Sequence, residues 1–131
     1  METTTKGQTM ITALEKKAEV REAIYSFVDF MNTEVIEFFA KRYPSLEPDV
    51  YEVDGGRKYI RIVARRGDSF GGAAYGGSVH CFVDAETGGV YKAATWKAPA
   101  LNGERFNLLD EASFAELKAK WDAHGGYLYK K

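Results

Sequence analysis

The stretch from Ser78 to Trp96 (SVHCFVDAETGGVYKAATW) constrains the fold of this chain more than any other. Polar and apolar side chains alternate over the first seven residues, as in a β-strand that has one buried face. The next five residues form turn-type sequence, because glycine adopts the positive φ that tight connections need. β-Branched and aromatic residues then resume an extended pattern, and Pro99 ends it because proline cannot donate to a β-ladder. The stretch therefore predicts a β-hairpin.

Length and composition favour one domain, residues 1–131, with a polar and Thr-rich tail over residues 1–9 that is expected to be disordered. The net charge of −1 argues against a protein that coats DNA through a large positive excess. No run approaches the roughly 18 apolar residues that a membrane span requires. The single cysteine, Cys81, and a first segment without the apolar core of a secretion signal indicate a cytosolic protein.

A long amphipathic helix is predicted before the first strand. Thr12 and Glu15 stand at capping-box spacing, and Pro44 disfavours helix in the residue before it, so we expect a helix from about Thr12 to Tyr43. Asn32-Thr33 marks a kink or break. The apolar stripe recurs at three- and four-residue steps and consists of Val20, Ile24, Phe27, Val28, Met31, Val35, Phe38 and Phe39.

Such a helix of roughly 30 residues is about 45 Å long, which exceeds the width of a small domain. Its apolar stripe is expected to pack on the sheet. Its first turns then either project from the domain or are covered by a partner chain, and the latter arrangement predicts a homo-oligomer.

Two further strands and a second helix complete the predicted elements. Residues 49–54 and 57–66 read as strands joined by a glycine turn. The glycine-rich segment 67–77 is either a ligand lid or a plain connector, and residues 97–109 look irregular. Asp110 or Ser113 can cap the C-terminal helix, and residues 127–131 either add an edge strand or lie loose. The sum is an α+β fold, with a long N-terminal helix packed on a three- to four-stranded antiparallel β-meander and with a C-terminal helix.

The alternation of the strands predicts two different faces. One face carries Ile60, Ile62 and Ala64 and is expected under the helix. The opposite face then carries Arg61, Arg65, His80 and Phe82, with part of the pair Lys92 and Trp96. Guanidinium groups beside aromatic rings suit a planar anion. The alternative is a solvated face whose arginines pair with Glu52, Asp54 or Asp84.

His80 and Cys81 are adjacent, so a regular strand would point them to opposite faces. This spacing argues against a metal site and against a Cys–His nucleophile pair, and it leaves Cys81 as a small buried residue. His80 remains a candidate general acid or base. Near the strand end stand the polar or amphipathic groups of Trp96, Lys97, Arg105 and Asn107, which are candidates for ligand binding. The alternative is that Trp96 plugs the edge of the core while Lys97 and Arg105 are solvated.

The segment from 84 to 107 resembles a motif, TGxVxKAAxWKAPA followed by RxN, of small tailed-bacteriophage proteins of unknown function. The residues that carry the resemblance are Asp84, Thr87, Gly88, Val90, Lys92, Ala93, Ala94, Trp96, Lys97, Ala98, Pro99, Ala100, Arg105 and Asn107. The chain departs from the motif after Ala100, where LNGE stands in place of a more basic spacer. The resemblance implies a compact viral accessory protein and implies no reaction.

We therefore expect a non-enzymatic protein, without a metal or cofactor, that binds an anionic small molecule or nucleic acid during host takeover or counter-defence. The expected ligand-binding residues are Arg61, Arg65, His80, Trp96, Lys97, Arg105 and Asn107. A host protein is a second type of partner. The alternative is a protein–protein interaction module that dimerises through the long N-terminal helix.

Overall fold

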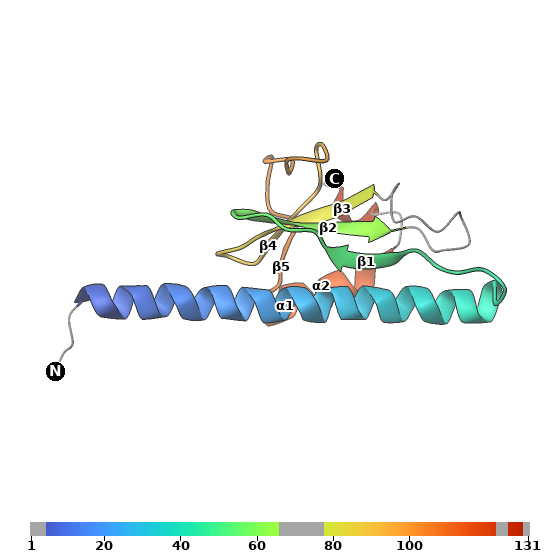
Figure 1. Ribbon diagram of the computed structural model, residues 1–131, viewed down its shortest axis with the longest axis horizontal. Coiled ribbons are helices and arrows are strands. Elements are labelled where there is room, and N and C mark those ends of the chain that lie inside the picture. Colours follow the sequence, from blue (N-terminus) through green and yellow to red (C-terminus); the bar gives the residue numbers. More distant parts are fainter. Residues whose placement is uncertain (1–4, 66–77, 123–125, 130–131) are drawn as a thin grey trace.

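The computed structural model describes residues 5–65, 78–122 and 126–129, and only the backbone for residues 5–16. Helix α1 (Thr5–Arg42) runs along one side of an antiparallel sheet (Figure 1). The strands are β1 (Val50–Val53), β2 (Tyr59–Arg65), β3 (Ser78–Asp84), β4 (Gly89–Tyr91) and β5 (Phe106–Asn107). Helix α2 (Glu111–Lys120) and the 3-10 helix η2 (Gly126–Leu128) follow. The predicted α+β class is confirmed.

The sheet is a meander in the order β1-β2-β3-β4-β5, with antiparallel pairs throughout. The predicted hairpin is present as β3 and β4, although β4 ends at Tyr91. The structure has one strand more than predicted, because residues 106–107 of the expected irregular segment pair with β4. The predicted glycine loop, 67–77, lies outside the described residues.

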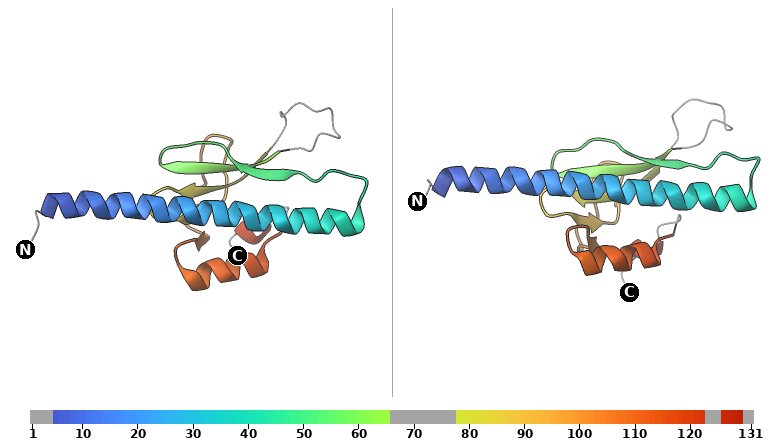
Figure 2. Two further views of the ribbon diagram at one scale, coloured as in Figure 1. Left: turned by 60° about the horizontal axis from the view of Figure 1, so that its bottom comes forward. Right: turned by 90° about the horizontal axis from the view of Figure 1, so that it is seen from below.

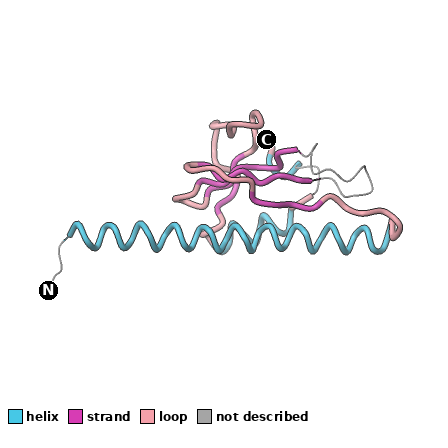
Figure 3. Tube along the Cα trace, viewed as in Figure 1, coloured by secondary structure: helices cyan, strands magenta, loops and turns pink. Residues whose placement is uncertain are grey.

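Helix α1 is continuous and longer than predicted (Figure 3). It begins at Thr5 instead of near Thr12, since no proline interrupts the segment and each added residue contributes one helical hydrogen bond. The break expected at Asn32-Thr33 is absent. The helix ends at Arg42, as the following Tyr43-Pro44 predicted. Its N-terminal turns extend past the end of the sheet (Figure 1).

One face of the sheet carries the hydrophobic core. The stripe of α1 packs there, and α2 and η2 lie beside α1 on the same side of the sheet (Figure 2). The fully or almost fully buried members are Val20, Ile24, Phe27, Met31, Tyr51, Ile62, Cys81, Val83, Val90, Leu108, Leu117 and Leu128. Asp110 caps α2 by accepting a hydrogen bond from the Ser113 amide at 3.2 Å. None of the described helices is both long and apolar enough to cross a lipid bilayer.

Candidate functional site

A β-bulge separates two residues that the alternation placed on one face. Ile62 pairs with Cys81, and the next residue of β2, Val63, pairs with Val79, so His80 is the extra residue. The inserted residue reverses the alternation along β3. Arg61 pairs with Phe82 and faces away from the helices, whereas His80 faces the core. The prediction that Arg61 and His80 share a surface is therefore wrong.

His80 lies in an aromatic pocket on the helix side of the sheet. Its ring centroid is 5.0 Å from that of Tyr51, a core residue, and Nε2 is 2.6 Å from the hydroxyl of Tyr127 in η2. Burial lowers the pKa of His80 to about 4, partly opposed by the nearby carboxylate of Asp122. The imidazole is therefore neutral at pH 7 and joins η2 to the sheet.

Cys81 faces the same core as His80, since both lie against Tyr51. The prediction that these neighbours point to opposite faces is wrong, again because of the bulge. Burial raises the pKa of the Cys81 thiol, so the group stays protonated and unreactive. Over the described parts of the chain, no three His, Cys, Asp or Glu side chains are grouped closely enough to hold a metal ion.

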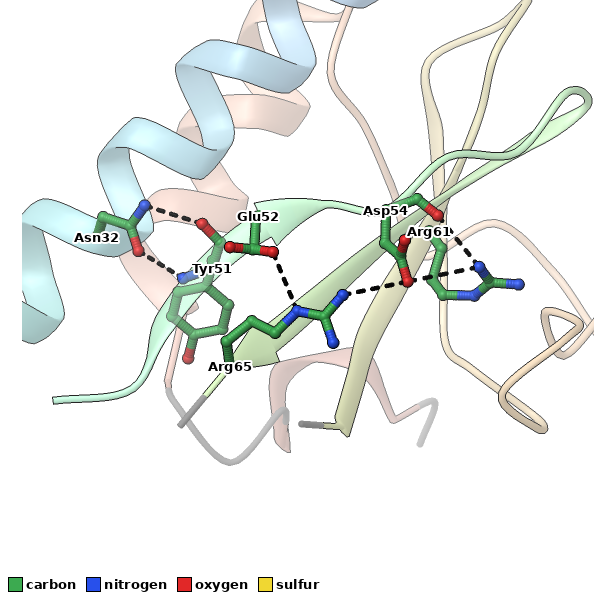
Figure 4. A network of polar contacts seen from close by, with 6 residues as sticks. All are labelled: Asn32, Tyr51, Glu52, Asp54, Arg61 and Arg65. Atoms are coloured by element: carbon green, nitrogen blue, oxygen red, sulfur yellow. Dashed lines mark hydrogen bonds and ion pairs between the residues drawn. The ribbon is translucent and has the colours of Figure 1, made fainter. Parts of the chain in front are cut away.

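Arg61 is held on the outer face of the sheet by several partners (Figure 4). Its Nε donates to the carbonyl of Trp96 at 2.8 Å, and its Nη1 donates to the carbonyl of Asp54 at 3.1 Å. The guanidinium carbon lies 5.3 Å from the ring centroid of Trp96 and 5.8 Å from that of Phe82. These contacts use the stacking and hydrogen-bonding capacity that a ligand would need.

Arg65 is paired with two carboxylates, one on the adjacent strand β1 and one just after it. Its Nε lies 3.0 Å from Oε1 of Glu52, and its Nη2 lies 3.5 Å from Oδ2 of Asp54 (Figure 4). The same Asp54 oxygen lies 3.7 Å from Nη1 of Arg61. The two arginines therefore form a network with acidic groups, which is the alternative that the sequence left open for this face.

Arg105 and Asn107 fasten the segment after β4. Arg105 donates to the carbonyls of Leu128 and Gly103 and, at 3.2 Å, to Oδ1 of Asn102. Asn107 donates to the carbonyl of Thr87 at 3.0 Å and accepts from the Leu109 amide at 2.8 Å. The polar groups of both side chains are therefore used in hydrogen bonds within the chain.

Trp96 and Lys97 are the two predicted site residues that stand open to solvent. They lie in a loop that the Thr95 hydroxyl organises, accepting from the amides of Lys97 and Ala98 at 3.1 Å each. The Trp96 side chain stays 43% exposed beside Arg61. Of the seven predicted residues, Arg61, Arg65, Trp96 and Lys97 belong to the outer side, and His80 belongs to the core side.

A basic groove lies elsewhere, between α1 and the β1–β2 turn, and the sequence reasoning missed it. Its volume is about 270 Å³. Three cationic side chains border it, Lys17 and Arg21 from α1 and Arg57 from the turn. The other lining residues are apolar, aromatic or glycine and are Val20, Ile24, Tyr25, Val53, Gly56, Ile60 and Ala85. We call this site the α1 groove.

No acidic side chain among the described residues lines the α1 groove to neutralise its cations. Among the residues that the structure describes, none of Lys17, Arg21 and Arg57 forms an ion pair, in contrast to Arg61 and Arg65. The floor is apolar, since Val20 and Ile24 are buried beneath the groove. Three unpaired cations above an apolar floor can hold a ligand that joins an anionic group to an apolar or aromatic body.

The geometry of the groove depends on the turn at Gly55-Gly56. Gly56 has a φ of +120°, and a Cβ at this position would overlap the carbonyl oxygen of Tyr59. The close approach carries Arg57 next to α1. In the sequence, the only signal was the four-residue spacing of Lys17 and Arg21, which puts both on one side of a helix.

Comparison with known proteins gives a family and no activity. Residues 5–130 match the model of a family of unknown function, DUF7717. No curated protein and no solved structure matches the chain.

Proposed function

The chain belongs to the family of unknown function DUF7717, and we propose that it is a non-enzymatic protein that binds an anionic ligand in the α1 groove. The single observation that carries the proposal is the set of three unpaired cations, Lys17, Arg21 and Arg57, around an apolar floor, with no carboxylate among the described residues that line it. Binding here requires no rearrangement of existing ion pairs, whereas a ligand at Arg61 or Arg65 must displace Asp54 or Glu52.

The ligand class that fits is a nucleotide or a nucleotide unit of a nucleic acid. Its phosphate would accept charge-assisted hydrogen bonds from Arg57, Arg21 and Lys17. Its base would lie on the apolar floor beside the exposed ring of Tyr25. The volume of about 270 Å³ lies just below the range of ligand pockets, which begins at about 300 Å³, so a nucleotide unit would be only partly enclosed. The protein would then act by sequestering the nucleotide.

The biological setting belongs to the same proposal. The resemblance of residues 84–107 to tailed-phage proteins supports a viral accessory role, in host takeover or counter-defence. In the structure, this motif shapes turns: Asp84 accepts from the amides of Glu86 and Thr87, and Ala93 pairs with Pro99. A single buried thiol suits the reducing host cytoplasm.

Calorimetric titration with nucleoside monophosphates, nucleoside triphosphates, inorganic phosphate and a short single-stranded oligonucleotide tests the proposal. We expect at least one nucleotide to bind, and Lys17→Ala and Arg57→Ala each to weaken that binding about tenfold. Lys41→Ala, which removes an exposed cation from the last turn of the same helix, is the matched control and should bind like the wild type.

A second pair of variants decides between the two surfaces. If Trp96→Ala and Lys97→Ala abolish nucleotide binding while Lys17→Ala and Arg57→Ala leave it intact, the ligand occupies the outer face and the α1 groove is not the site. Absence of binding by every probe, with no thermal stabilisation at millimolar ligand, would overturn the proposal for nucleotides altogether.

A further inference from the structure

The flank of α1 beside the β1–β2 turn presents a large aromatic side chain where a solvated helix would carry polar residues. Tyr25 is 58% exposed, although it stands in the middle of the helix. Ile36, eleven residues further on and therefore about three turns along the same flank, is 50% exposed. These two exposed side chains leave apolar helix surface on this flank that a second molecule can contact.

Charge is distributed with opposite signs on the two sides of Tyr25. Arg21 and Asp29 stand four residues before and four residues after it, so the three side chains follow one another along the helix. The hollow on the first side is the α1 groove with its cations. The hollow on the second side is bordered by Glu22, Tyr25, Ser26 and Asp29. Within the described residues, Arg21 and Asp29 form no ion pair.

This arrangement is complementary to itself under a two-fold rotation. We propose that the chain forms a homodimer in which two α1 helices pack antiparallel, with Tyr25 against Tyr25 of the second copy. The rotation places Arg21 opposite Asp29 of the second copy and Asp29 opposite Arg21 of the second copy. Such a contact is isologous, since both copies use the same surface, and it contains the Arg21–Asp29 ion pair twice. Parallel packing would instead align like charges.

The length of α1 makes this contact accessible. Its 38 residues extend about 57 Å at 1.5 Å per residue, and its N-terminal turns run beyond the sheet (Figure 1). The flank with Tyr25 and Ile36 is not the one that faces the hydrophobic core, since Phe27 and Met31 do so. It adjoins the sheet edge, because Asn32 lies between Tyr25 and Ile36 on this flank and is bonded to the Tyr51 backbone. The second helix must therefore approach Tyr25 from the side that points away from β1.

The dimer and the proposed ligand share two residues, Tyr25 and Arg21, and the ring of Tyr25 would contact either the nucleotide base or the second copy. Arg21 borders the α1 groove and also belongs to the contact with Asp29 of the second copy. If the proposed function holds, an anionic ligand competes with that carboxylate, and by linkage nucleotide binding lowers the dimer fraction. The dimer itself does not depend on the proposed function.

Charge reversal tests the dimer by sedimentation velocity and light scattering over a concentration series. Arg21→Glu and Asp29→Arg each place like charges together, and we expect each to raise the dimer dissociation constant about tenfold or more. The double variant Arg21→Glu/Asp29→Arg restores opposite charges in both contacts and should recover the dimer. Glu37→Arg, an exposed reversal elsewhere on α1, should leave the dimer unchanged.

The outcomes are decisive because Arg21, Asp29 and Glu37 are all exposed and circular dichroism will report whether the fold persists. A wild-type chain that is monomeric at every concentration overturns the inference, as does a dimer that neither single reversal weakens. Failure of the double variant to recover the dimer overturns the antiparallel register. Nucleotide binding gives a separate readout, since Arg21→Glu should lose it and the double variant should not regain it.

Discussion

The side chain of Asn32, in α1, pairs with the backbone of Tyr51, in β1, as a neighbouring strand would. Nδ2 of Asn32 donates to the Tyr51 carbonyl at 3.0 Å, and the Tyr51 amide donates to Oδ1 of Asn32 at 2.7 Å (Figure 4). β1 is an edge strand, and the unpaired groups of such an edge are open to another chain. Asn32 satisfies two of them and fixes α1 relative to the sheet.

Replacing Asn32 should therefore destabilise the protein, even though the replacement favours helix. Alanine and leucine are better helix formers than asparagine, so propensity alone predicts a gain in stability. We expect instead a loss of about 2 kcal/mol for Asn32→Ala and Asn32→Leu, because Tyr51 is left with two unpaired backbone groups. Urea unfolding measures the loss. Thr33→Ala, at an exposed neighbouring position, is the control and should change stability by less than about 0.5 kcal/mol.

His80 should make the stability of the fold depend on pH. Its pKa is about 4 in the folded state against an ordinary 6.5, so the unfolded chain binds more protons between these values. The contribution of His80 to the unfolding free energy is fully present above pH 6.5. It is lost as the pH falls toward 4, because protons bind preferentially to the unfolded chain. The loss attributable to His80 is about 2 kcal/mol at pH 5.

The measurement is the unfolding free energy of the wild type and of His80→Gln at pH 7 and pH 5. The other titrating groups are the same in both proteins. The change in unfolding free energy between pH 7 and pH 5, compared between the wild type and His80→Gln, therefore isolates the effect of the imidazole. An equal pH effect in the two proteins would show that His80 is not held in its neutral form by burial.

The sequence was sufficient to predict those parts of the fold that follow from local periodicity. The stripe of α1, the β3–β4 hairpin and the Asp110 cap each rest on spacings of a few residues, and all three are present. Short connections led correctly to the meander. The break expected at Asn32 is absent because the amide serves the sheet, a contact with a strand nineteen residues away that no local pattern specifies.

The candidate site was less predictable, for two physical reasons. The division of residues between the sheet faces assumed unbroken alternation, and one extra residue at His80 moves that side chain to the other face. The α1 groove joins Lys17 and Arg21 to Arg57, and their proximity depends on how the helix is seated on the core. Pairing of Arg61 with Asp54, in contrast, was an alternative already visible in the sequence.

Arg61 should matter for stability and not for ligand binding. We expect Arg61→Ala to cost about 1–2 kcal/mol, since it removes two hydrogen bonds to backbone carbonyls and the contact with Trp96. Nucleotide affinity should stay within about twofold of the wild type, because Arg61 lies outside the α1 groove. Chemical unfolding and titration on the same sample measure both. Loss of binding by a variant that remains folded would return the site to the outer face.

The two glycines of the β1–β2 turn should respond differently to alanine. At Gly56, a Cβ would overlap the Tyr59 carbonyl and φ is +120°, so Gly56→Ala should destabilise the fold by about 2–3 kcal/mol and weaken binding in the adjacent groove. At Gly55, φ is +71° and a Cβ meets open space, so Gly55→Ala should cost only about 1 kcal/mol. Thermal unfolding ranks the two variants, and nucleotide titration reports the groove. A Gly56→Ala protein as stable as Gly55→Ala would mean that the turn can relax and that it does not fix the position of Arg57.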